Sequence, residues 1–68
     1  MTGKVIRSFK DRGYGFIKDT ASDNVYFCHF VNTDDGSLSR GSLGNYRVAY
    51  DSKHDRVQAK DVKVIQAQ

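Results

Sequence analysis

The residues of this chain whose types and spacing could do chemistry are aromatic side chains that alternate with glycine. They form the run Arg12-Gly13-Tyr14-Gly15-Phe16-Ile17. In a β-strand, side chains two residues apart lie on the same face, so Tyr14 and Phe16 would stand together. Two exposed rings suit the stacking of bases, and Arg12 beside them suits a phosphate. This is the chemistry of single-stranded nucleic-acid binding.

A second aromatic run, Tyr26-Phe27-Cys28-His29-Phe30, follows after a polar stretch. Strand alternation puts Phe27 and His29 on one face and Cys28 on the other. If this strand pairs beside the first, the two faces combine. We then expect one continuous aromatic platform, with Phe30 at the strand end, made of Tyr14, Phe16, Phe27, His29 and Phe30.

Other reactive groups have simpler interpretations. His29 lacks the partners of a metal site and no nucleophile is placed beside it, which favours stacking. Cys28 is expected in the core. The adjacent Asp34 and Asp35 are interpreted as solvated loop residues, and His54 lies in a polar turn. We therefore expect no metal, no cofactor and no enzyme activity.

The elements that must position these residues are strands. Val, Ile, Phe and Tyr dominate the apolar residues, and no window has helical periodicity. The predicted strands are 3–10, 13–20, 24–30, 45–51 and 56–65, with a long loop over 31–44. Short antiparallel strands leave bare edges unless the sheet closes, so the sequence predicts one all-β domain over residues 1–68, a small five-stranded antiparallel barrel.

Strand alternation predicts two positions at which these strands are irregular. Ile17 should point inward, but Gly15 on the same side has no side chain, so the core is expected to be thin there. Lys60 would share a face with apolar neighbours, which indicates a bulge or strand end. The other inward positions are expected to be Val48, Tyr50, Val62 and Val64.

Composition sets further limits. The chain of 68 residues has eleven Lys and Arg, eight Asp and no Glu, giving a net charge of +3, a mild excess that permits nucleic-acid binding without demonstrating it. One cysteine excludes an internal disulfide and suits a reducing compartment. With no apolar run of membrane-spanning length, we expect a cytoplasmic protein with no membrane partner and no small-molecule substrate. A monomer is expected, and the edge strands leave a dimer open.

The two aromatic runs together resemble the cold-shock domain family, in which a K-G-F-G-F-I type motif and a V-F-V-H-F type motif lie on neighbouring strands. Weaker similarity covers Val48-Ala49-Tyr50 and Gln58-Ala59 before Val62. The resemblance implies a five-stranded OB-fold barrel. It also implies binding of single-stranded RNA or DNA with little sequence dependence, as an RNA chaperone or a regulator of transcription or translation. RNA-recognition motifs carry a similar Gly-aromatic run, but on a late strand after a helix.

The resemblance also implies roles for individual residues. Phe9 aligns with the Phe of the family's K-W-F strand and Arg12 with a basic binding position, while Arg7 and Gln58 match more loosely. The implied nucleic-acid-binding residues are Arg7, Phe9, Arg12, Tyr14, Phe16, Phe27, His29, Phe30 and Gln58.

The chain departs from the family at several places, as a divergent member would. Ser8 stands where the family has Trp, the connection from Phe9 to Gly13 is one residue shorter, and Leu38 lies near a usual Phe. Arg56-Val57 replaces a Gly-Pro. These departures keep an alternative open, namely an OB-fold protein-interaction module whose nucleic-acid binding is weakened or lost.

Overall fold

The computed structural model describes residues 1–67, and five strands make up most of them. The strands are β1 (Thr2–Phe9), β2 (Tyr14–Asp19), β3 (Val25–His29), β4 (Leu43–Asp51) and β5 (Arg56–Gln66), with a short 3₁₀ turn, η1 (Phe30–Asn32), after β3. Every predicted strand is present, and no boundary differs from its prediction by more than two residues. The all-β prediction is confirmed.

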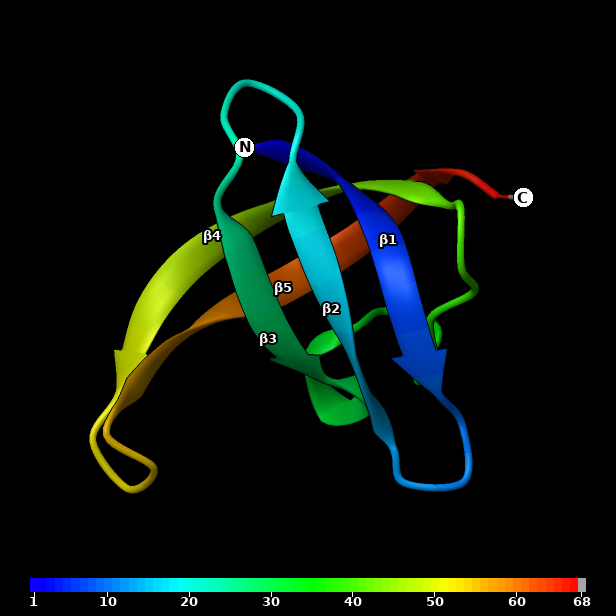
Figure 1. Cartoon of the computed structure of the whole chain (residues 1–68). Helices are drawn as coiled ribbons and strands as arrows, with labels where there is room; N and C mark the ends of the chain where they lie inside the picture. The colour runs from blue at the N-terminus through cyan, green and yellow to red at the C-terminus, as the bar shows by residue number, and fades with distance from the viewer. Residues whose placement is uncertain (68) are drawn as a thin grey trace.

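The strands close into a barrel in the order β1-β2-β3-β5-β4. Strands β1, β2 and β3 form one wall, and the longer β4 and β5 cross behind it (Figure 1). The pairing of β3 with β5 is parallel, through Phe27 and Gln58, whereas the other pairings are antiparallel. The predicted five-stranded barrel is confirmed, and its predicted antiparallel pairing holds except where β3 meets β5. Strand directions cannot alternate all the way round a ring of five, so one parallel pair is unavoidable.

A bulge in β1 sets which of its side chains join the outer face of the wall. Val5 pairs with Ile17 and Arg7 with Phe16, so the register shifts across Ile6. Val5 and Ile17 are buried, whereas Arg7 is exposed. Because alternation resumes after the bulge, Arg7 and Phe9 lie on the same face as the β2 rings opposite them.

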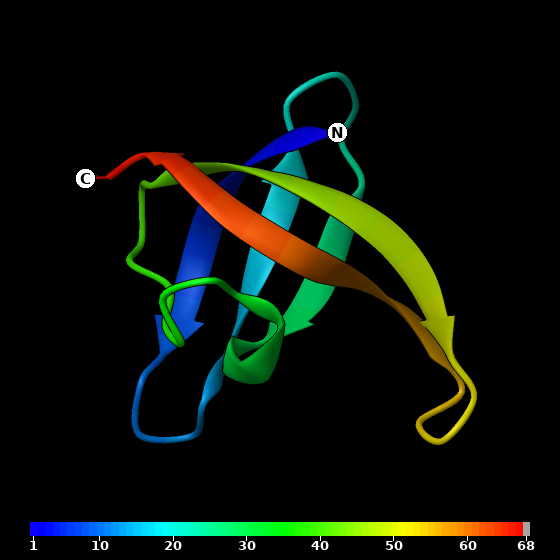
Figure 2. The ribbon, with the colours of Figure 1, turned by 180° about the vertical axis from the view of Figure 1, so that it is seen from behind.

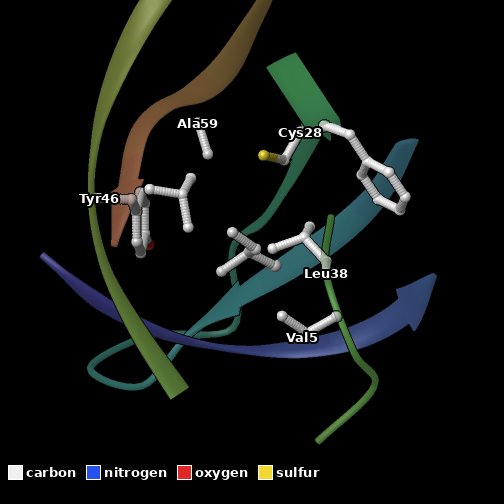
Figure 3. Close-up of a cluster of buried hydrophobic side chains, with 8 residues drawn as sticks. Val5, Cys28, Leu38, Tyr46 and Ala59 are labelled. Atoms are coloured by element: carbon white, nitrogen blue, oxygen red, sulfur yellow. The ribbon is translucent and has the colours of Figure 1, made fainter. Parts of the chain in front are cut away.

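The barrel interior holds one hydrophobic core (Figure 3). Ile17 and Cys28 are 1% and 0% exposed, which confirms both as inward residues. Tyr46 is also buried, and its hydroxyl donates to Asp19 Oδ1 at 3.0 Å, so the polar end of the ring is satisfied. The core consists of Val5, Ile17, Cys28, Phe30, Leu38, Tyr46, Ala59 and Val62, with Tyr26 and Val48 packed against it.

Two residues predicted to face the core lie outside it. Val64 is only half-buried and does not belong to the core cluster. Tyr50 is 60% exposed, because the β4–β5 hairpin extends past the other strands and Tyr50 pairs with Val57 on that extension (Figure 1). The predicted bulge near Lys60 is confirmed. The register shifts between the pairs Asn45–Lys63 and Arg47–Lys60, and Asp61 has a φ of 50°.

The long loop before β4 closes one end of the barrel (Figure 2). Leu38 is fully buried, and its Cδ1 would lie 3.4 Å from a Cβ built on Gly15. The space beside the glycine is therefore filled from the loop, and the core there is not thin. The Ser8 hydroxyl fixes this arrangement by donating to the Leu38 carbonyl at 2.6 Å.

Candidate nucleic-acid interface

Five rings gather on the outer face of β1, β2 and β3, and we call them the aromatic cluster. Phe9 pairs with Tyr14 and Tyr14 with His29, while Phe16 pairs with Phe27. The ring centroids of Tyr14 lie 5.2 Å from Phe9 and 5.1 Å from Phe27, and His29 lies 5.4 Å from Phe27. The structure thus brings together the predicted Phe9, Tyr14, Phe16, Phe27 and His29.

The rings of the aromatic cluster pack against one another. Phe16 is nearly perpendicular to Phe9, Tyr14 and Phe27, at 88°, 89° and 77°. Edge-to-face contacts of this kind hold aromatic rings in defined orientations. All five rings are half-buried, so each retains surface that a ligand could contact.

The tight turn between β1 and β2 holds Phe9 and Tyr14 in place. The backbone N–H groups of Arg12 and Gly13 both donate to the Phe9 carbonyl at 2.9 Å. Gly13 has a φ of 78°, a conformation that glycine adopts without a Cβ clash. The shortened connection therefore brings the two rings to neighbouring positions and leaves Arg12 exposed at the edge of the cluster.

Phe30 does not extend this face. Phe30 is 9% exposed and belongs to the hydrophobic core. Its backbone N–H donates to the Gly13 carbonyl at 2.9 Å. Strand alternation continues through the end of β3, so a residue that follows the outward His29 points inward. The expected place of Phe30 on the platform was wrong for this reason.

Gln58 is likewise not free for a ligand. It is 4% exposed, and its Nε2 donates to Asp51 Oδ2 at 2.7 Å while its Oε1 accepts from Asn32 Nδ2 at 3.3 Å. Both ends of the amide are used to join the β4–β5 hairpin to η1. The binding role implied for Gln58 is replaced by a structural one.

Arg56 is a residue of this face that the sequence reasoning missed. Its guanidinium carbon lies 3.9 Å from the centroid of the Phe27 ring, within the range of a cation–π contact. No local pattern in the sequence could have found it, because the contact depends on the parallel pairing of Gln58 with Phe27, which places β5 beside β3. Only that pairing brings Arg56, two residues before Gln58 on β5, within reach of the Phe27 ring.

The positive charges around the cluster are largely unneutralised. Among residues 1–67, no carboxylate forms an ion pair with Arg7, Arg12 or Arg56. The nearby Asp51 instead contacts His54, whose ring nitrogen lies 2.6 Å away, and this hydrogen bond lowers the pKa of Asp51. The face is therefore both aromatic and cationic.

The remaining candidate groups lie in the core or in the exposed loop. Burial raises the pKa of the Cys28 thiol to about 11, which opposes formation of a reactive thiolate. Asp34 and Asp35 are exposed in the loop. Within residues 1–67, His, Cys and Asp side chains form no group of three or more that could hold a metal ion. That part of the chain also contains no helix with the length and apolarity to cross a bilayer.

No model of a known protein family matches the chain, and a comparison with curated protein sequences found no match.

Proposed function

We propose that this protein binds single-stranded RNA or DNA on the aromatic cluster, with little dependence on base sequence. Bases stack on the exposed parts of the rings, and Arg7 and Arg12 contact phosphates. Stacking tolerates any base because every base has a π-face, which accounts for low sequence specificity. The protein is a binding protein rather than an enzyme, and it acts in the cytoplasm.

The observation that supports this function best is the composition of one outer sheet face. Five half-buried rings lie within 5.1 to 6.4 Å of a neighbour, with exposed arginines beside them. Each base stacked on such a ring contributes roughly 1 to 3 kcal/mol. The platform has no aromatic side chain at Ser8 and none at Leu38, which is buried. It should therefore bind more weakly than a platform with aromatic rings at both positions.

The proposed action on RNA follows from this preference for unpaired bases. A protein that binds the open strand better than the folded one shifts the folding equilibrium by its difference in affinity. No energy source is needed. The protein would act as an RNA chaperone. By the same shift in the folding equilibrium, it would regulate transcription or translation of an RNA that it binds.

The test is a titration with short oligo-U or oligo-dT followed by amide NMR. We expect the largest shifts at Tyr14, Phe16, Phe27 and His29, and Tyr14→Ala should weaken binding. Tyr50→Ala is the matched control, since Tyr50 is an exposed tyrosine on the β4–β5 hairpin outside the aromatic cluster. If these four amides do not move at high ligand concentration, the proposed function is wrong.

The competing function is a protein-interaction module that uses the same barrel. It is favoured by Ser8 in place of a large ring and by the burial of Leu38. Salt separates the two functions, because a single-strand complex weakens with a slope of about −0.7 in log K against log salt per phosphate neutralised. Binding of a protein partner that is insensitive to salt would support the module instead.

A further inference from the structure

Two shallow pockets lie side by side along β1, next to the aromatic cluster. The first has a volume of about 320 Å³ and is lined by Arg7, Ser8, Phe9 and Arg40. The second, of about 500 Å³, is lined by Lys4, Val5, Ile6, Lys18, Arg40 and Gly41. Arg40 lines both, so the two pockets adjoin, and we call them together the β1 groove.

The walls of the β1 groove are fixed by backbone contacts. The loop that supplies Arg40 is held against β1 by the Gly41 N–H, which donates to the Val5 carbonyl at 2.7 Å, and by the Val5 N–H, which donates to the Ser42 carbonyl at 2.9 Å. The small Ser8 side chain turns toward the Leu38 carbonyl at 2.6 Å. The groove is thus built into the free protein, since a small residue at position 8 leaves it open.

The charge of the β1 groove has a single sign. Four cationic residues line it and no acidic residue does. Lys4, Arg7 and Arg40 have no ion-pair partner among the described residues, and Lys18 contacts only the fully exposed Asp23 at 3.6 Å. Such an exposed pair contributes little and yields readily to another anion. The β1 groove can therefore bind a polyanion without first breaking a strong ion pair.

The β1 groove continues directly from the aromatic cluster. Phe9 belongs to both, as a lining residue of the first pocket and as the ring neighbour of Tyr14. From Phe9 back to Lys4 the strand covers about 17 Å at the usual rise per residue. Phe9 is also the only ring in the groove lining, so beyond it there is no surface for base stacking.

We infer that the β1 groove binds the phosphodiester backbone of the same single strand after it leaves the aromatic cluster. This inference rests on the proposed function and extends it. It assigns the β1 groove as a second part of the site, which binds phosphates by charge and stacks no bases. Lys4, Arg7, Lys18 and Arg40 contact phosphates, and bases there remain in solvent. Added affinity should therefore depend on oligonucleotide length and salt, and not on base identity.

The test compares oligothymidylates of about four and about eight nucleotides, within the range of site sizes known for OB folds. We expect the longer strand to bind the unmodified protein more tightly. Arg40→Gln should reduce that advantage by one phosphate contact and leave the short strand unaffected. Each lost phosphate contact should weaken binding about fivefold at roughly 0.1 M salt and reduce the salt slope by about 0.7.

Lys53→Gln is the charge-matched control, since Lys53 is exposed in the β4–β5 turn away from the groove. Lys4→Gln is a second variant on β1 that should act in the same direction as Arg40→Gln. Equal affinity for the two lengths, or equal effects of Arg40→Gln and Lys53→Gln, would contradict phosphate binding in the β1 groove. The proposed function would stand in that case if the short strand still binds the aromatic cluster. If the short strand itself does not shift the Tyr14 amide, the proposed function and this extension both fail.

Discussion

The guanidinium carbon of Arg56 lies 3.9 Å from the centroid of the Phe27 ring, so one face of that ring is already covered in the free protein. A base that stacks on this face must first displace the cation. The cation–π contact is worth about 0.5 to 1 kcal/mol at an exposed site, which is comparable with the lower end of a base–aromatic stack. Phe27 is therefore a weaker stacking surface than its position in the cluster suggests.

We predict that Tyr14→Ala weakens single-strand binding more than Phe27→Ala does. Loss of the Tyr14 ring should cost about 1 to 3 kcal/mol, whereas loss of Phe27 should cost about 0.5 to 1 kcal/mol less, the worth of the cation–π contact that a base must displace. In an Arg56→Ala background the ring is uncovered, and the cost of Phe27→Ala should rise toward that of Tyr14→Ala. Titration calorimetry of the four variants with one oligo-dT measures this. Equal costs in both backgrounds would contradict it.

We predict that Leu38→Ala destabilises the fold by about 2 to 5 kcal/mol, because it empties a fully buried site. Urea denaturation measures the free energy of unfolding. Ser37→Ala is the neighbouring control, since Ser37 is exposed in the same loop and should change stability by less than about 0.5 kcal/mol. A similar small effect for Leu38→Ala would contradict the burial of this side chain.

We predict different costs for alanine at two glycines of the first motif. At Gly15 the added Cβ would lie 2.5 Å from the Arg7 carbonyl oxygen, so β1 and β2 would have to move apart, at a cost of about 1 to 3 kcal/mol or more. At Gly13 there is open space but a φ of 78°, which costs roughly 1 kcal/mol. Thermal unfolding should rank Gly15→Ala as the less stable variant. The reverse order would be inconsistent with this packing.

We predict that Cys28 resists alkylation in the folded protein. Burial raises the pKa of its thiol from 9.0 to about 11, so the native state holds the proton more tightly than the unfolded state does. The associated stability is fully present below pH 9 and is lost as pH rises toward 11. Iodoacetamide labelling at about pH 8 should be slow without urea and fast in it.

The matched variant for this alkaline effect is Cys28→Ala. Tyr46 is a second source of alkaline instability, because burial and its hydrogen bond to Asp19 raise the pKa of its hydroxyl. The variant retains the contribution of Tyr46, so the difference between the two proteins isolates Cys28. An identical decline of stability above pH 9 in both would exclude a role for the thiol.

The sequence by itself determined the five strands and the side chains of the central wall. Period-two alternation is a local property, so it placed Tyr14, Phe16, Phe27 and His29 on one face and Ile17 and Cys28 on the other. The same alternation, followed strictly, would have turned Phe30 inward, where the structure has it. The bulge near Lys60 was also readable, because a charged residue interrupted an apolar face.

Only the tertiary structure decided the contacts that depend on closing the barrel. Arg56 reaches Phe27 and Gln58 joins Asp51 to Asn32 because β5 returns beside β3. Leu38 fills the space beside Gly15 because the long loop folds back across β1. Each contact joins residues that no local pattern relates. Ring closure of five strands sets their distances, and it places Arg56 over the Phe27 ring and Arg40 beside β1.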